Sequence, residues 1–215
     1  GNIMETFIHQ ALMSDTSLCD DMISYHKSKA DAKFEYTRPG MTTGGPGDTG
    51  KKSTDTMIHP TTSNSVIREY VEHLRHALAS YIKKYTFAPK MLHLAEPFNI
   101  QHYKPSEAYF GWHSERINHE VFQRGLVFMT YLNDVTDEGE TEWYYQRVKV
   151  KPRKGLTVIW PTDFTHTHRG IPSKTQDKFI CTGWFHFLDA HATRVHYEGV
   201  LQHIGAKIEQ PKPVE

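Results

Sequence analysis

The sequence predicts an α+β protein that is mainly β, in which two helices precede a sandwich or jelly roll of short strands. Two segments before residue 90 carry apolar side chains at helical spacing. After Pro89 the chain changes to short runs rich in Val, Ile, Tyr, Phe, Trp and Thr, and Gly, Pro, Asn or Asp separate these runs. That texture is typical of strands, and no helical segment interrupts it.

A short amphipathic helix is predicted from Ser14 to about Lys29. Its apolar residues follow polar residues that favour helix starts, namely Leu18, Met22 and Tyr25 after Ser14, Asp15 and Thr16. A longer helix is predicted from about Ser65 to Tyr85, because it keeps one continuous apolar face opposite a charged one. We expect both helices to pack on the outside of one sheet and to support it.

The segment between the helices, from Arg38 to Pro60, is rich in Gly, Pro, Ser, Thr and Asp and has little periodicity. It is predicted to be a long loop. Loops of this length are usually disordered or functional. Two interpretations stay open, a surface connection and a lid over a substrate site.

The strands are predicted from hydrophobic and β-branched runs bounded by turn residues. They lie near Phe98 to Tyr103, Tyr109 to His113, Leu126 to Leu132, Thr141 to Tyr145, Arg147 to Val150, Leu156 to Trp160, Thr165 to Gly170 and Phe179 to Phe187. We interpret residues 1–215 as one domain, with helical support and the Gly-rich loop in 1–90, a jelly-roll core in 97–187 and a C-terminal extension in 188–215. A short helix is predicted in the extension, near Tyr197 to Ile204.

The composition argues against nucleic acid and membranes as binding partners. Lys plus Arg and Asp plus Glu number 25 each, so no basic field attracts nucleic acid or a membrane surface. We expect no apolar stretch long enough to span a bilayer and no secretory signal. Cys19 and Cys181 lie far apart and indicate neither a disulfide framework nor a CxxC metal site. The expected compartment is the cytoplasm.

A candidate metal site begins with His113 and Glu115. Residues two apart on a strand point to the same side, so both side chains are expected to face the inside of the barrel. Two histidines and one carboxylate leave part of an octahedral iron shell open, as oxygen-activating iron requires. The third ligand can be His166 or His168, which are also two residues apart.

The spacing around His168 resembles that of the iron(II)/2-oxoglutarate-dependent dioxygenases, in the prolyl 4-hydroxylase-like branch. That family has an HxD motif, a distal His, a Lys or Arg ten positions on and a Trp six further. Lys178 and Trp184 follow His168 at these positions, which favours His168 over His166. Glu115 stands where the family has Asp. The alternatives are that Asp163 replaces it or that the site is degenerate.

Two further motifs carry the resemblance. Tyr103-Lys104-Pro105-Ser106-Glu107-Ala108-Tyr109 is similar to the family's Tyr-x-x-Gly-x-x-Tyr approach to the first His, with Ser106 for Gly and one extra residue. Tyr131-Leu132-Asn133 followed by Gly139-Glu140-Thr141-Glu142-Trp143 resembles the family's Tyr-Leu-Asn strand and Gly-Gly-x-Thr-x-Phe turn, with Glu138 for the first Gly. The resemblance covers about Tyr103 to His186.

The resemblance implies a double-stranded β-helix, a form of jelly roll, that holds iron(II) on His113, Glu115 and His168. It implies 2-oxoglutarate as co-substrate, with ascorbate as a further candidate. Lys178 is then expected to pair with the far carboxylate, because a buried carboxylate is costly unless paired. Tyr131 resembles the tyrosine that hydrogen-bonds the same carboxylate, and Tyr103 the one nearer the chelating end.

The implied reaction splits O₂, releases succinate and carbon dioxide, and hydroxylates an unactivated C–H bond. The substrate is a prolyl residue of a peptide or protein, or a small molecule. Trp184 is expected to pack, and Arg169 to face outward as a candidate for substrate contact. Two rival interpretations stay open. One is a cupin-like metal enzyme that does not use 2-oxoglutarate. The other is a non-catalytic jelly-roll module that binds through aromatic residues such as Trp112, Trp143 and Tyr144.

Overall fold

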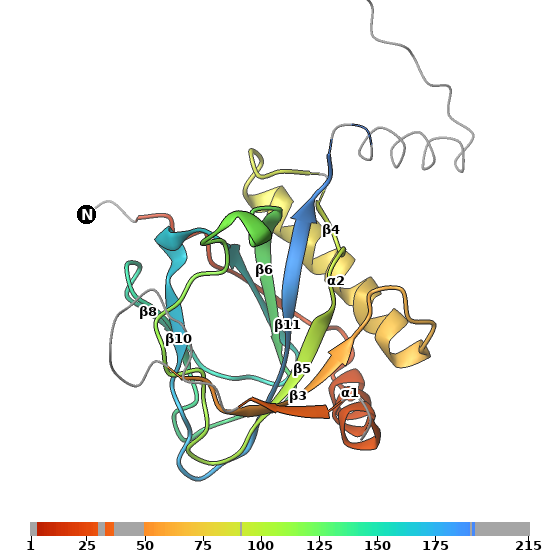
Figure 1. Ribbon diagram of the computed structural model, residues 1–215, viewed down its shortest axis with the longest axis vertical. Helices are drawn as coiled ribbons and strands as arrows, with labels where there is room; N and C mark the ends of the chain where they lie inside the picture. Colours follow the sequence, from red (N-terminus) through yellow and green to blue (C-terminus); the bar gives the residue numbers. More distant parts are fainter. Residues whose placement is uncertain (1–3, 30–32, 37–49, 91, 190, 192–215) are drawn as a thin grey trace, which may run out of the picture.

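The computed structural model describes residues 4–29, 33–36, 50–90, 92–189 and 191. In these residues two antiparallel sheets face each other (Figure 1). The larger, eight-stranded sheet has the order β1 (His9–Leu12), β9 (Leu156–Pro161), β6 (Arg124–Tyr131), β11 (Lys178–Phe187), β5 (Phe98–Tyr103), β3 (Ser53–Ile58) and β2 (Lys33–Tyr36), and β4 (Leu92–His93) also pairs with β11. The smaller has the order β10 (His168–Gly170), β7 (Thr141–Trp143) and β8 (Val148–Val150). The predicted mainly β class is confirmed.

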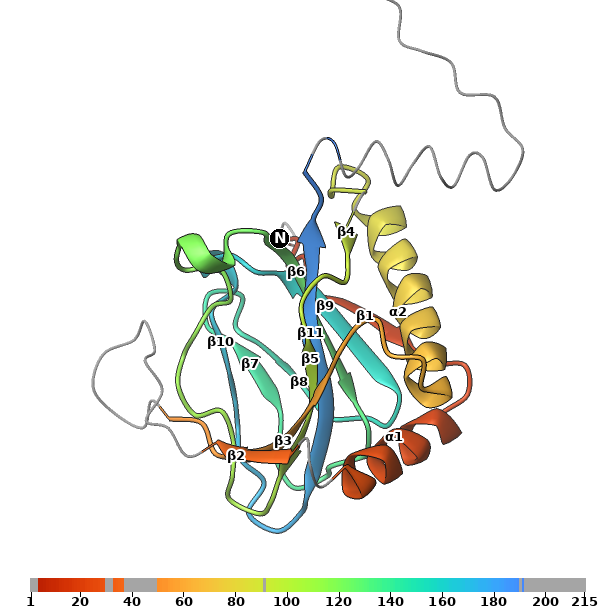
Figure 2. The same ribbon diagram turned by 45° about the vertical axis from the view of Figure 1, so that its right-hand side comes forward.

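Two helices, α1 (Ser17–Ser28) and α2 (Ser65–Lys84), lie on the outer side of the larger sheet (Figure 2). Helix α2 begins where its sequence pattern begins, because the Asn64 side chain accepts hydrogen bonds from the backbone N–H groups of Val66 (3.0 Å) and Ile67 (3.2 Å). The apolar faces of both helices belong to one core cluster together with side chains of the larger sheet. The predicted supporting role of the helices is confirmed.

Strand β11 shows how the sheet separates packing from chemistry. Phe179, Cys181 and Phe185 belong to the core cluster beneath the helices. The alternate residues Lys178, Ile180, Thr182 and Trp184 line a cavity on the other face. Because successive side chains of a strand point to opposite faces, one strand serves both purposes.

The predicted loop from Arg38 to Pro60 is wrong at its C-terminal end, where Ser53–Ile58 form β3 and pair with β5 and β2. The sequence does not predict this strand because three of its four buried side chains, those of Ser53, Asp55 and Thr56, are polar. Asp55 accepts hydrogen bonds from Ser53 Oγ (2.7 Å) and Lys51 Nζ (2.7 Å), and Thr56 Oγ1 lies 2.7 Å from His26 Nδ1. Side-chain partners thus replace the apolar alternation that signals a strand. Residues 37–49 lie outside the described part.

Other boundaries also differ. The predicted strand from Tyr109 to His113 is wrong, since only single bridges join Tyr109 to Lys51 and His113 to His168. The strand predicted from Thr165 begins only at His168, after the 3₁₀ turn η3 (Phe164–His166). Strands β1, β2 and β4 were not predicted. The helix expected near Tyr197 to Ile204 lies outside the described residues. Among the described helices, none has the length and apolarity needed to cross a membrane.

Candidate active site

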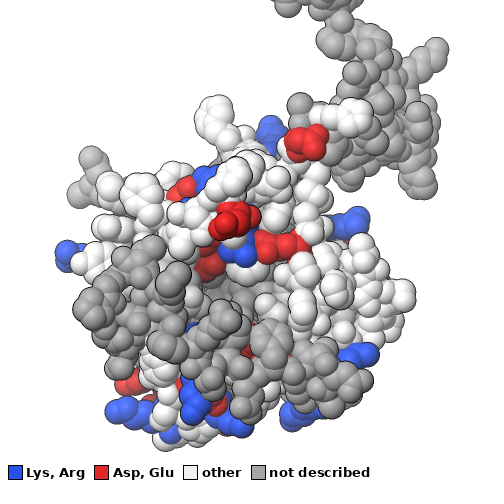
Figure 3. Space-filling model, in the orientation of Figure 1, with Lys and Arg blue, Asp and Glu red and all other residues white. Residues whose placement is uncertain are grey.

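A cavity of about 320 Å³ lies between the two sheets. Its walls come from both sheets and from the irregular segment that carries His113 and Glu115. Tyr103 and Lys178 also line it. The face of the molecule drawn in Figure 3 is hollowed near its centre, and acidic and basic side chains lie side by side there. The fold therefore brings most of the predicted site residues to one cavity that opens to the surface.

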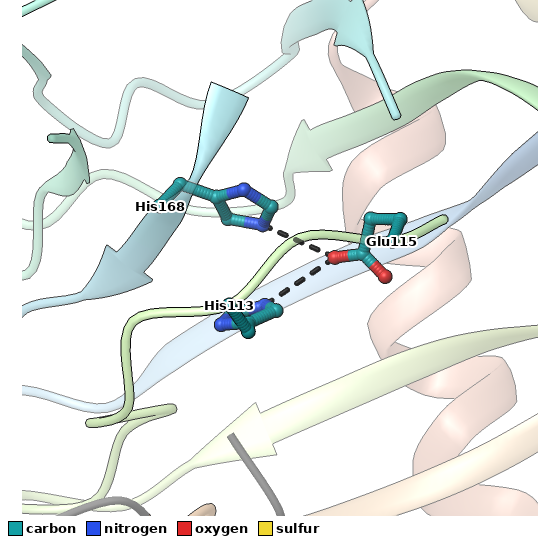
Figure 4. A group of neighbouring side chains, drawn as sticks. All are labelled: His113, Glu115 and His168. Atoms are coloured by element: carbon teal, nitrogen blue, oxygen red, sulfur yellow. Dashed lines mark ion pairs between the residues drawn. The ribbon is translucent and has the colours of Figure 1, made fainter. Parts of the chain in front are cut away.

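His113, Glu115 and His168 form one group, here called the metal triad, in which one ligand atom from each lies within 4.8 Å of the others. Glu115 Oε1 lies 3.3 Å from His113 Nε2 and 3.1 Å from His168 Nε2 (Figure 4). Paired backbone hydrogen bonds of 3.0 and 2.9 Å between His113 and His168 hold the two segments together. The metal triad thus rests on a backbone contact between distant parts of the chain.

The protonation of the two imidazoles follows from their outer contacts. His113 Nδ1 lies 2.7 Å from the carbonyl oxygen of Gly111, and His168 Nδ1 lies 2.9 Å from that of His166. A carbonyl oxygen only accepts, so each Nδ1 carries a hydrogen and each neutral imidazole turns the lone pair of Nε2 inward. These lone pairs meet a carboxylate oxygen. Such an arrangement needs a cation between them, and its donor set suits a transition metal such as iron.

The pKa values favour the form that binds metal. Burial lowers the pKa of His168, and the neighbouring His113 lowers it further, so the neutral imidazole is favoured. Burial alone would raise the pKa of Glu115, but His113 and His168, when they carry a proton on Nε2, outweigh burial by hydrogen bonding and charge and hold the pKa well below its usual range. The carboxylate is therefore ionised.

The two residues considered as alternative metal ligands, His166 and Asp163, contact other groups. His166 Nε2 lies 2.8 Å from the carbonyl oxygen of Thr6, and Asp163 accepts a hydrogen bond from Arg116 Nε at 3.1 Å. Neither residue belongs to the metal triad. The geometry therefore agrees with the choice of His168, which the ten-residue spacing to Lys178 favours.

Lys178 is buried, and its Nζ donates to the carbonyl oxygen of Gly139 at 2.8 Å. It lies 5.6 Å from the ring centre of Tyr103 and 5.8 Å from that of Tyr131. Burial lowers the pKa of Lys178 to about 8, and Glu140 opposes this shift only in part. Within the part of the chain that the structure describes, Lys178 forms no ion pair. An anion in the cavity would supply one.

The two tyrosines differ in their access to the cavity. Tyr103 lines it, and its hydroxyl donates to Gln101 Oε1 at 2.7 Å. Tyr131 is fully buried, and its hydroxyl lies 2.7 Å from Thr141 Oγ1 and 3.2 Å from the carbonyl oxygen of Val150. Thr141 lines the cavity while Tyr131 lies behind it. The hydrogen bond expected from Tyr131 to the far carboxylate of 2-oxoglutarate stays a prediction. Thr141, which lines the cavity and contacts the Tyr131 hydroxyl, lies closer to such a ligand.

Several residues that the sequence did not single out also line the cavity. They include the buried ion pair between Lys51 and Asp55, and Arg124, which stacks on Trp184. Lys51 and Asp55 lie in the predicted loop, so no strand pattern directed attention to them. The expectation that Arg169 faces outward is wrong, since the residue lines the cavity with its guanidinium 4.3 Å from the ring centre of Trp112. Trp184 contacts Glu115 as well as packing.

Comparison with known proteins adds independent support. Residues 98–186 match the model of the 2OG-Fe(II) oxygenase superfamily. A viral collagen prolyl hydroxylase from Paramecium Bursaria Chlorella virus-1, solved as a 2OG complex, is 18% identical with a TM-score of 0.62, over 85% of this chain and 97% of that chain. A Pseudomonas putida prolyl-4-hydroxylase is 16% identical with a TM-score of 0.61, over 84% and 92%.

A third solved structure is similar in the same way. It is a prolyl hydroxylase from Trichoplax adhaerens in complex with a peptide fragment of the hypoxia inducible factor oxygen degradation domain. It is 13% identical with a TM-score of 0.63, over 87% of this chain and 86% of that chain. At such identities these likenesses establish the fold, which confirms the predicted jelly roll. No curated protein sequence is significantly similar to this chain.

The matched segment contains the whole metal triad and Lys178. Its donor set fits iron(II), and the buried cation beside it fits a carboxylate co-substrate. Residues 98–186 therefore belong to the 2OG-Fe(II) oxygenase superfamily, and they carry donors that fit iron(II) and a buried cation that fits 2-oxoglutarate.

Proposed function

We propose that this oxygenase hydroxylates a prolyl residue of a peptide or protein, with iron(II) held by His113, Glu115 and His168. The observation that carries the proposal is the convergence of two imidazole lone pairs and one ionised carboxylate oxygen within 4.8 Å. The similar structures are prolyl hydroxylases, and one of them holds a peptide, which supports a peptidyl substrate.

Lys178 is the proposed partner of the far carboxylate of 2-oxoglutarate. Lys178 is buried and no carboxylate among the described residues pairs with it, which is unfavourable for a cation, and an anionic ligand would remove that cost. The ring of Tyr103 lies beside the ammonium group and lines the same cavity, and its hydroxyl adds a hydrogen bond to the carboxylate if it exchanges its acceptor, Gln101 Oε1. These residues select a diacid by charge at one end of the cavity.

Bound iron(II), with 2-oxoglutarate and O₂, supplies the oxidation that hydroxylates the C–H bond. The protein supplies positions and the exclusion of water. His113 and His168 are fixed by their Nδ1 hydrogen bonds, so each offers one lone pair in a set direction. Glu115 adds a single negative charge at the same point.

The residues near Arg169 suit a proline-containing peptide. Arg169 stacks on Trp112, and Trp112 meets the ring of Tyr144 edge to face at 5.2 Å. Tyr144 is largely exposed. Aromatic faces are a common surface for the rigid rings of proline-rich segments, and the guanidinium donates to peptide carbonyl groups.

The proposal is tested by incubating the protein with iron(II), 2-oxoglutarate, O₂ and a panel of peptides that differ at a single proline. The expected result is succinate release coupled to the gain of one oxygen atom on that proline, as seen by mass spectrometry. A matched peptide with Ala at this position should not be modified, and His168→Ala should be inactive. Succinate release that depends on a small molecule and on no peptide would contradict the prolyl substrate.

A further inference from the structure

The two oxygens of the Glu115 carboxylate have separate partners. Oε1 lies between the imidazoles of His113 and His168, whereas Oε2 accepts a hydrogen bond of 3.2 Å from the indole N–H of Trp184 and lies 4.0 Å from Arg124 Nη1. We propose that Trp184 is a positioning residue for Glu115, which holds Oε2 aside and presents Oε1 alone to the metal. This inference rests on the proposed role of Glu115 as an iron ligand.

The contrast with the two histidines explains why such a residue is needed. Each imidazole is fixed by a backbone carbonyl oxygen, which no side-chain substitution removes. The carboxylate of Glu115 is fixed by side chains instead, because Trp184 donates the hydrogen bond to Oε2 and Arg124 adds a longer ion pair. Glutamate also has one more rotatable bond than aspartate, so its carboxylate has more orientations to exclude. Contacts of this kind around metal ligands set ligand orientation and metal affinity.

Trp184 is itself held rigidly. The Arg124 guanidinium stacks 3.6 Å from the centre of its ring and donates to the Glu115 carbonyl oxygen through Nη1 at 3.1 Å. Glu96 anchors Arg124 by accepting from Nε at 2.6 Å and from Nη2 at 3.0 Å. His186 Nε2 lies 2.6 Å from the same carboxylate of Glu96. The indole N–H therefore has a defined direction, which a packing residue alone would not require.

The test is Trp184→Phe, which removes the N–H but keeps an aromatic ring for Arg124. Binding of manganese(II) to the full chain is followed by the EPR signal of the free ion. We expect affinity to fall about 10- to 100-fold, the usual effect of losing a contact to a metal ligand. Trp143→Phe is the matched control, because no described residue accepts a hydrogen bond from the buried Trp143 indole nitrogen. An unchanged affinity in Trp184→Phe would overturn the inference.

A double-mutant cycle separates positioning from general damage. In Glu115→Asp the carboxylate is one methylene shorter and is drawn back from Trp184. Trp184→Phe should then cost no further manganese affinity in the Glu115→Asp background. An equal loss in both backgrounds would overturn the inference, because it would show that the substitution acts without Glu115.

His113→Ala distinguishes this inference from the proposed function. If His113→Ala binds manganese as tightly as the native chain, the metal triad itself is wrong and the inference falls with it. If His113→Ala loses manganese binding and Trp184→Phe keeps it, only the positioning role of Trp184 is wrong.

Discussion

Two regions of one cavity carry opposite charges, a carboxylate in the metal triad and an ammonium group at Lys178. In the metal triad, two imidazole nitrogens and an ionised carboxylate converge on one point. Around Lys178, a buried ammonium group faces two tyrosine rings and a carbonyl oxygen, with no carboxylate from the described residues paired to it. Each region is thus completed by a ligand of opposite charge. The difference predicts that metal binding at the triad and carboxylate binding at Lys178 can be abolished separately by substitution.

The largest effect is expected from removing a ligand of the metal triad. His168→Ala should weaken binding of manganese(II) or iron(II) by more than about 100-fold, because a direct ligand contributes more than the contacts that orient it. Equilibrium titration under anaerobic conditions measures this. His166→Ala is the matched control, since this buried histidine lies two residues away and contacts Thr6 instead. Equal losses in both variants would contradict the assignment.

The second largest effect is expected from removing the charge of Lys178. Lys178→Met should weaken 2-oxoglutarate binding by about 100-fold or more, since removing one partner of a buried charge pair costs about 3–5 kcal/mol. The weak visible charge-transfer band of the iron(II) chelate, titrated without oxygen, reports this binding. Manganese affinity should stay unchanged in the same variant. A band that is indifferent to Lys178→Met would contradict the co-substrate assignment.

A smaller effect is expected from pH. The pKa of Lys178 is lowered to about 8, and only the protonated form attracts a carboxylate. Affinity for 2-oxoglutarate should therefore be constant below this pKa and fall above it, by up to about tenfold per pH unit. Lys178→Arg is the control, because guanidinium stays charged and the decline should disappear. A decline of equal size in Lys178→Arg would assign the titration to another group.

The smallest effects are expected outside both regions. Ser106 (φ 70°) and Glu138 (φ 57°) have left-handed backbone conformations, and both stand where the family motifs have Gly. A side chain there costs roughly 1–2 kcal/mol, while Gly adds chain entropy worth about 0.4–1 kcal/mol to the unfolded state. Ser106→Gly and Glu138→Gly should each raise the free energy of unfolding by about 0.5–1 kcal/mol in denaturant titrations. Glu107→Gly, which is not left-handed, should lower it.

The sequence anticipated elements with a regular apolar pattern. Helix α2 and strand β5 lie where the pattern predicts them, because their buried faces are made of apolar side chains at fixed spacing. The sequence pattern does not predict strand β3, because Ser53, Asp55 and Thr56 are buried and make hydrogen bonds to polar partners. Such pairing is invisible until the chain is folded.

The metal triad shows the same division. The sequence by itself determined the donor types, the pairing of His113 with Glu115 and the distance from His168 to Lys178 along the chain. Only the tertiary structure decided that Tyr131 lies behind Thr141 and that Trp184 holds one carboxylate oxygen, whereas the preference for His168 over His166 came from the spacing and agrees with the geometry. The reason is physical. Spacing along a strand sets which face a side chain occupies, whereas a contact between strands depends on their register and on bridges between distant segments.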